Sequence, residues 1–176
     1  IWWGTHKALT MLDLDLYRTV GGTPIIHFDG IIVNNSIIDF YELMDHETNF
    51  KNSGLYFSSV EPFTNTPNDL RLPYDQNHIT FKFCAIDWAS PTQIQYKFKL
   101  EGFDKDWSAI TKENFADYRN INPGVYTFKI RTKGKTNIWS DELRYSFKIR
   151  NPWWRQWWAY IVYSLLFMLF FCAVLR

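Results

Sequence analysis

The residue types that most often perform catalysis are few in this chain and far apart. Four histidines occur, and none has a cysteine at the spacing of a zinc site: His6, His27, His46 and His78. The sequence contains neither a glycine-rich phosphate loop nor the strand–serine–helix elbow of esterases. We therefore predict that the chain is not an enzyme and holds no catalytic site, cofactor or metal.

Two aspartates in the segment GFDKDW give the strongest alternative, which is a calcium site. Asp104 and Asp106 offer carboxylate ligands, but the segment lacks the remaining ligands of a calcium loop. The acidic segment DHE, residues 45–47, lies in a polar stretch and predicts a solvated loop. Aspartates in turns commonly hydrogen bond the backbone of the same turn, and we expect that role in GFDKDW.

The composition favours a β-rich domain over a nucleic-acid-binding protein. The formal net charge is only +1 over 176 residues, so no general attraction to nucleic acid is expected. Aromatic residues make up 19% of the chain and occur with Val, Ile and Thr, which are enriched in strands. Cys84 falls in a strand-like segment and Cys172 in the terminal apolar run, so we expect no disulfide between them.

Four segments alternate apolar and polar side chains with a period of two. This alternation, with turn sequences in between, predicts antiparallel strands that bury one face. We therefore predict an all-β domain, an antiparallel sandwich of the fibronectin III or immunoglobulin type. The residues expected to face the core are Ile79, Phe81, Phe83, Ala85, Ile94, Tyr96, Phe98, Leu100, Tyr126, Phe128, Ile130, Leu143, Tyr145, Phe147 and Ile149.

The segment NINPGVY combines a tight turn with a tyrosine at the start of the next strand. Pro123 and Gly124 supply the turn. In sandwiches of the immunoglobulin type, a tyrosine placed here hydrogen bonds through its hydroxyl to the backbone of the corner. Tyr126 is our candidate for this role, and a tyrosine that only fills the core is the alternative.

The remaining stretches are less regular. IWWGTHKALTMLDLDLY predicts a hairpin with Trp2 and Trp3 in its first strand, which needs neighbours from outside this chain because a lone hairpin is only marginally stable. The stretch from about Asp45 to Asn68 is polar and predicts long loops around one short strand.

The last segment has the composition of a membrane-spanning helix. No charged residue occurs from Gln156 to Leu175, and about 20 helical residues extend about 30 Å, the thickness of a bilayer's hydrocarbon core. A cluster of tryptophans precedes it, as in the aromatic belts of membrane interfaces: Trp153, Trp154, Trp157 and Trp158. We therefore predict one transmembrane helix over residues 152–176, with membrane lipid as a partner.

The joint between the last predicted strand and this helix has no flexible linker. Asn151 can cap a helix, and Pro152 suits its first turn. No stretch rich in Gly or Ser precedes them. We therefore expect a displacement of the sandwich to pass into the helix.

In combination, these motifs resemble the Y_Y_Y (triple-tyrosine) domain of bacterial sensor proteins, most familiar from hybrid two-component regulators of Bacteroides-like bacteria. The matching motifs are LPYDQN, QYKFKLEGFDKDW, YRNINPGVYTF, the Trp-Ser pair after the next turn, and NPWW. The tyrosines that correspond to the family's name are Tyr96, Tyr118 and Tyr126. The other signature residues are Gly102, Trp107, Pro123, Gly124 and Trp139.

The resemblance implies domain boundaries, a location and partners. Residues 23–151 would form the sandwich, and residues 1–20 the last strands of a truncated β-propeller. The sandwich would lie in the periplasm beside the inner membrane, although a count of basic residues before the helix would place it in the cytoplasm. The implied partners are upstream propellers and a downstream histidine kinase of the same polypeptide, and a second copy in a homodimer. Nucleic acid is not an expected partner of this segment.

The leading hypothesis is a non-catalytic, membrane-proximal relay in a glycan-sensing two-component sensor. Rearrangement of the propellers would reach the kinase through Asn151, Pro152 and the tryptophan cluster. One alternative is a membrane-anchored carbohydrate-binding or adhesion module, with Trp88, Trp107 or Trp139 as its aromatic platform. Another is the sensor half of a membrane-bound DNA-binding regulator.

Overall fold

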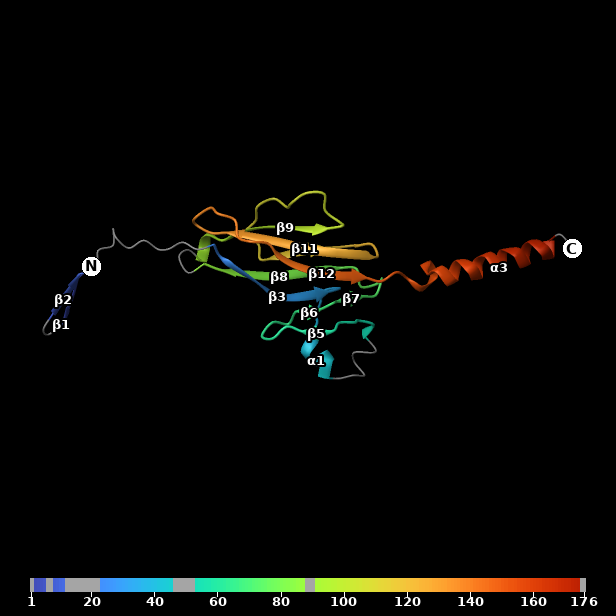
Figure 1. Cartoon of the computed structure of the whole chain (residues 1–176), viewed down its shortest axis with the longest axis horizontal. Helices are drawn as coiled ribbons and strands as arrows, with labels where there is room; N and C mark the ends of the chain where they lie inside the picture. The colour runs from blue at the N-terminus through green and yellow to red at the C-terminus, as the bar shows by residue number, and fades with distance from the viewer. Residues whose placement is uncertain (1, 6–7, 12–22, 46–52, 88–90, 175–176) are drawn as a thin grey trace.

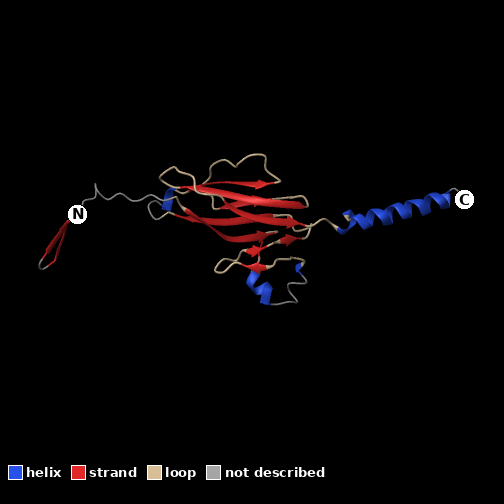
Figure 2. Ribbon diagram, in the orientation of Figure 1, coloured by secondary structure: helices blue, strands red, loops and turns tan. Residues whose placement is uncertain are grey.

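Two four-stranded sheets form the body of the protein and pack over one aromatic core (Figure 1, Figure 2). The computed structural model describes residues 2–5, 8–11, 23–45, 53–87 and 91–174. The first sheet has the order β10 (Phe115–Tyr118), β8 (Ile79–Ile86), β3 (Ile25–Val33) and β4 (Ser36–Ile37). The second has the order β7 (Arg71–Leu72), β12 (Leu143–Ile149), β11 (Gly124–Lys133) and β9 (Gln95–Glu101).

The predicted alternation is confirmed in both sheets. Phe81 of β8 stacks on Phe128 of β11 with ring centroids 4.3 Å apart, and this contact joins the two sheets at their centre. Most residues expected to face the core are buried there, and Ala85, Ile94, Phe98 and Leu143 are partly buried against it. Period-two alternation was sufficient here because each long strand buries one face only.

Shorter elements complete the fold. β1 (Trp2–Thr5) and β2 (Ala8–Met11) form an antiparallel hairpin, as predicted for these residues, while Leu12, Leu14 and Leu16 lie outside the described residues. Helix α1 (Phe40–Asp45) precedes the polar stretch, which contributes a small hairpin of β5 (Ser59–Val60) and β6 (Pro67–Asn68). A 3-10 turn, η1 (Pro91–Gln93), precedes β9.

Two features differ from the predicted loops and purely antiparallel sheets. Helix α1 was not expected, and it forms because the Asp39 carboxylate accepts hydrogen bonds from the Tyr41 and Glu42 amides while Phe40 is fully buried. β7 pairs with β12 in parallel, with Leu72 opposite Ile149. Arg71 and Leu72 are too short a run for periodicity to reveal.

The C-terminal helix starts later than the predicted span. A 3-10 turn, η2 (Trp153–Arg155), comes first, and α3 covers only Trp157–Val174, which is 18 residues. Within the described part of the chain, no helix has both the length and the apolar character to cross a membrane. The predicted transmembrane helix is therefore not supported.

The helix cap predicted at the joint is also wrong. Pro152 occupies the N-cap position of η2 in an extended conformation, and no side chain caps this turn. Asn151 lies one residue earlier, so its side chain does not start the helix. The α-helix begins only after Gln156, which is also extended.

Asp117 ties edge strand β10 to β8 through Thr80 and His78, and its carboxylate is also bound by Arg119. Its carboxylate accepts hydrogen bonds from Thr80 at 2.7 Å and from Arg119 at 2.8 Å, and it contacts His78 at 2.6 Å. Partial burial disfavours the charged carboxylate, but these three partners outweigh that effect and lower the pKa of Asp117 to about 2.

This lowered pKa predicts a stability change in acid. Because the folded form holds the proton less tightly than the unfolded chain, the stabilisation is complete above about pH 4 and is lost as the pH falls towards 2. Asp117→Asn should therefore flatten the dependence of unfolding free energy on pH between about 4 and 2, measured by urea denaturation. Asp106→Asn is the control, because Asp106 is exposed and has no hydrogen bond among the described residues. An unchanged slope in Asp117→Asn would contradict the assignment.

Candidate functional site

The three signature tyrosines lie inside the sandwich, and each hydroxyl reaches a different strand or turn. Tyr96 of β9 accepts a hydrogen bond at 3.1 Å from the amide of Ala85 on β8, which belongs to the opposite sheet. Tyr118 of β10 donates at 2.8 Å to the Asp104 carboxylate, in the turn that follows β9 of the opposite sheet. Each of these hydrogen bonds therefore crosses from one sheet to the other.

Tyr126 forms the predicted tyrosine corner. Its hydroxyl donates at 2.8 Å to the carbonyl of Asn122, four residues upstream, in the connection that carries the chain from β10 to β11. This confirms the corner role and goes beyond simple filling of the core. Burial raises the pKa of Tyr126, so the phenol remains a donor. Pro123, also a signature residue, lies half-buried inside this corner.

Two signature glycines lie against the ring of Tyr126. Gly102 has a φ of +93°, and a Cβ built on it would come within 3.0 Å of the Tyr126 ring. A Cβ on Gly124 would lie 3.3 Å from the Tyr126 hydroxyl and ring. A side chain at Gly102 would meet both the ring and an unfavourable φ, whereas one at Gly124 would require the ring to shift by a few tenths of an ångström.

Asp104 supports its own turn and orients Tyr118. Its carboxylate accepts a hydrogen bond of 2.8 Å from the amide of Leu100, which confirms the expected role within the turn. Burial and the bond to this carboxylate raise the pKa of Tyr118, which keeps its hydroxyl protonated. Among the described residues, no cluster of three His, Cys, Asp or Glu side chains could hold a metal. Cys84 and Cys172 are both free thiols.

A fourth buried tyrosine also hydrogen bonds a distant backbone carbonyl, although no sequence motif singled it out. Tyr145 of β12 donates a hydrogen bond of 2.7 Å to the carbonyl of Pro67 on β6. Burial, with a smaller contribution from nearby acidic residues, raises the pKa of Tyr145. Alternation predicted its inward direction, but the partner comes from an irregular segment that alternation cannot place.

Two signature tryptophans lie on the outer face of the second sheet, among basic side chains. The Lys97 ammonium lies 4.3 Å from the ring centroid of Trp139 and 5.2 Å from that of Trp107. Arg131 also lies over Trp107, and Lys133 over Trp139, so cations contact both rings. These contacts assign the tryptophans a packing role and weaken the case for a free aromatic platform. Trp88 lies outside the described residues.

The joint between the sandwich and α3 is short and bonded to the sheet. The amide of Lys148 donates to Leu70 and that of Arg150 to Leu72, at 2.9 and 2.8 Å, so β12 is held by β7 to its end. Only Arg150, Asn151 and Pro152 lie between β12 and η2. The Arg150 guanidinium also donates to the carbonyl of Gly54.

Aromatic rings fasten η2 between the sandwich and α3. Trp154 meets Tyr74, at the base of the sandwich, edge to face with centroids 5.0 Å apart. The rings of Trp153 and Trp154 lie edge to face with centroids 5.6 Å apart. The ring of Trp153 also stacks on that of Trp158 in α3, with centroids 6.2 Å apart. The side chain of Trp157 is more exposed than those of its neighbours and lies outside this aromatic cluster. Among the predicted coupling residues, Trp153, Trp154 and Trp158 therefore lie together, and Tyr74 is a member of their cluster that no sequence pattern indicated.

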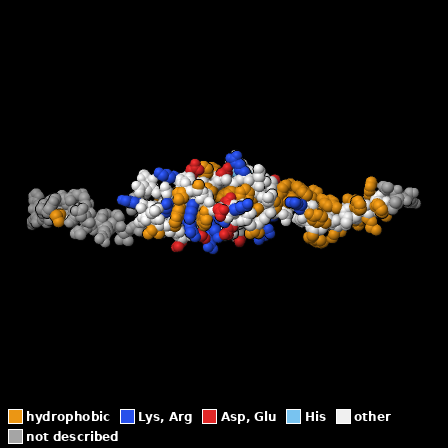
Figure 3. Space-filling model, turned by 90° about the horizontal axis from the view of Figure 1, so that it is seen from above, with side chains coloured by type: hydrophobic (Ala, Val, Ile, Leu, Met, Phe, Trp, Pro, Cys, Tyr) orange, Lys and Arg blue, Asp and Glu red, His pale blue; other side chains and the backbone are white. Residues whose placement is uncertain are grey.

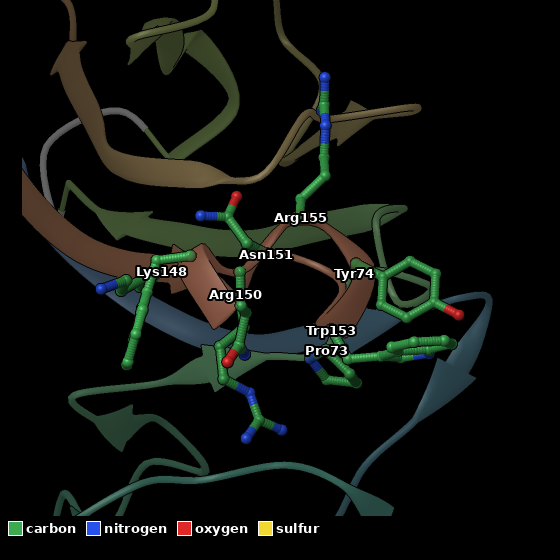
Figure 4. A pocket seen from close by; sticks show the side chains of 9 residues that line it. Pro73, Tyr74, Lys148, Arg150, Asn151, Trp153 and Arg155 are labelled. Atoms are coloured by element: carbon green, nitrogen blue, oxygen red, sulfur yellow. The ribbon is translucent and has the colours of Figure 1, made fainter. Parts of the chain in front are cut away.

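A cavity of about 590 Å³ opens beside this aromatic cluster (Figure 4). Its lining combines three cations, two amide side chains and apolar rings, with no carboxylate: Pro73, Tyr74, Lys148, Arg150, Asn151, Trp153, Arg155, Gln156 and Trp157. In the close view, Arg150 and Arg155 extend to opposite sides of the joint, and Tyr74 lies beside Trp153. Basic groups therefore surround the joint on more than one side.

Comparison with known proteins identifies the tyrosine-containing region. The Y_Y_Y domain family matches residues 88–150, which contain all three signature tyrosines and their partner Asp104. This part of the chain is similar to Y_Y_Y domains. The match begins after β8, so the other sheet of the sandwich is supplied largely by residues upstream of the matched part.

Relatives of this region occur in much longer proteins. Histidine kinase P4 of Formosa agariphila is 23% identical over 95 residues, which cover 53% of this chain and 7% of the kinase. Two structures of the extracellular domain of BT4673 from B. thetaiotaomicron are 21% and 22% identical, with TM-scores of 0.52 and 0.53. They cover 78% and 75% of this chain and 16% of each BT4673 chain, and they show a shared fold.

The contact between Gly102 and Tyr126 predicts a specific loss of stability. Gly102→Ala should lower the free energy of unfolding by about 1–3 kcal/mol, because the new Cβ meets both an unfavourable φ and the Tyr126 ring. Gly30→Ala is the matched control, since a Cβ there meets nothing within 4 Å. Urea denaturation of both variants measures the difference. Equal effects at the two glycines would contradict the role assigned to Gly102.

The hydrogen bond that Tyr118 makes between the two sheets predicts a second loss of stability. Tyr118→Phe removes the donor to Asp104 and should cost about 1–2 kcal/mol of unfolding free energy. Tyr56→Phe removes a hydroxyl from an exposed ring that makes no hydrogen bond among the described residues. It should leave the denaturation midpoint unchanged. A midpoint in Tyr118→Phe that matches the wild type would show that the bond contributes nothing.

Proposed function

We propose that this chain is a non-catalytic relay segment of a two-component sensor, which transmits displacements of upstream domains through its sandwich into α3. The similarity of the domain to a histidine kinase and to extracellular sensor domains supports a place within a sensor. Because the chain spans less than a fifth of these relatives, their ligands and outputs enter only as parts of this proposal.

The observation that carries the proposal is the rigid joint. Hydrogen bonds hold β12 along β7 up to Arg150, and the ring contacts from Tyr74 through Trp154 and Trp153 continue into α3. Each contact is fixed by packing or by the backbone, so a rotation or shift of the sandwich would move the start of α3 with it. A flexible tether would absorb the same movement.

The surroundings of the segment follow from the same proposal. Residues 1–20 would be the end of an upstream β-propeller, and the sandwich would lie in the periplasm beside the inner membrane as part of a homodimer. Upstream propellers would bind the signal, a glycan, and a histidine kinase would receive it. A DNA-binding regulator is the alternative output, since BT4673 is described both as a one-component and as a hybrid two-component system.

Loss of rigidity at the joint should abolish signalling without loss of folding. We expect a Gly-Ser-Gly-Ser insertion after Arg150, in a receptor that carries this segment, to reduce ligand-induced reporter transcription to near its basal level. The inserted residues would separate the β12–β7 hydrogen bonds from the Trp153–Trp154–Tyr74 contacts. Reporter output and surface abundance of the receptor are the two measurements.

A matched insertion tests whether position matters. The same four residues placed after Thr136, in the exposed turn between β11 and β12, lengthen a loop at the opposite end of the sandwich. That variant should signal normally. A receptor that signals normally with the insertion after Arg150 would refute the relay, whereas failure of both variants would point to misfolding, which the abundance measurement detects.

A further inference from the structure

The cations at the joint lack acidic partners. Among the described residues, no carboxylate forms an ion pair with Lys148, Arg150 or Arg155, although five ion pairs occur elsewhere on the sandwich. The Arg150 guanidinium is held by the carbonyl of Gly54, which positions it and leaves its charge uncompensated. None of the described residues that line the cavity beside them is acidic. The joint is therefore a site of concentrated positive charge in a chain that is almost neutral overall.

The joint and the neighbouring start of α3 also expose aromatic and aliphatic side chains. Trp153 is 59% exposed and Trp157 is 76% exposed, beside the basic residues that line the cavity. Beyond them, the exposed side chains that are described on α3 are apolar or aromatic, with the exception of Ser164. Figure 3 shows this change along the molecule, with charged side chains over the sandwich and hydrophobic ones over the joint and α3.

We propose that the joint docks onto the anionic headgroups of a phospholipid surface, with Lys148 and Arg155 contacting the phosphates. Charge complementarity selects this occupant: free cations attract a negative surface, indole rings favour the boundary between headgroups and acyl chains, and apolar α3 side chains favour the acyl region. A second copy of the chain is a poorer fit, because it would bring the same positive charges together. The inference goes beyond the relay, since it concerns a lipid contact of the chain itself.

Vesicle flotation with the full chain tests this docking. Binding to vesicles of phosphatidylcholine with 30% phosphatidylglycerol should be at least tenfold tighter than binding to pure phosphatidylcholine. Lys148→Gln/Arg155→Gln should lose about 25-fold on the anionic vesicles, about fivefold for each cation, and little on the neutral ones. Raising the salt from about 50 to 500 mM should weaken the wild type more than this variant.

Lys112→Gln/Lys135→Gln is the matched control. It removes the same charge, but both lysines are exposed and lie near the end of the sandwich that is opposite the joint, as strand register shows. Its binding should stay within about twofold of the wild type. Circular dichroism of both double variants establishes that they are folded.

Three results would overturn the proposal. Equal affinity for neutral and anionic vesicles would show that apolar contact alone drives binding. Equal losses in the two double variants would show that net charge matters and the joint does not. Competition by about 10 mM inorganic phosphate or glycerol phosphate, at constant ionic strength, would assign the site to a free anion. The signalling assay above is independent, so failure here leaves the relay untouched.

Discussion

The sandwich depends on the need of buried phenol hydroxyls for hydrogen-bond partners. Tyr96, Tyr118, Tyr126 and Tyr145 fill the core with their rings, and a buried hydroxyl left without a partner would be costly. Each finds its partner in another strand or in a connecting turn, and the bonds of Tyr96 and Tyr118 cross from one sheet to the other. The hydrophobic core alone would allow the sheets to slide. These hydroxyls fix one arrangement, so apolar burial and positional specificity come from the same side chains.

This arrangement extends to the end of the domain where α3 starts. Tyr126 stacks on Phe147 of β12 with centroids 5.7 Å apart, and Gly124 pairs with Ile149 at the last rung of the ladder. The tyrosine corner therefore stabilises the strand that leads into the joint. The signature residues and the coupling residues form one continuous structure, in which Gly102 and Gly124 admit the ring and Trp154 and Tyr74 fasten the helix.

Sequence reasoning was most successful where a short-range rule decided the structure. The long strands, the corner at Tyr126 and the turn role of Asp104 each follow from period-two burial or from turn chemistry over a few residues. It was less successful where contacts between segments far apart in the sequence determine the structure. Helix α1 forms because Phe40 packs on Phe57, the parallel β7 pair depends on β12, and the start of α3 is delayed by contacts of Trp153 and Trp154. The cations over Trp107 and Trp139 come from neighbouring strands, which only register brings together.

The position of β12 has a mechanical consequence. This strand lies between β11 and β7, hydrogen bonded on both sides, and it leads directly into α3. A force that pulls the helix along the strand axis would act in shear on the hydrogen bonds between β12 and both neighbouring strands. These hydrogen bonds would then resist together and would not break one after another. A sideways force on the helix would instead act first on the ring contact between Tyr74 and Trp154. The domain is thus stiff to tension and more compliant to bending, which makes the direction of a stimulus as important as its size.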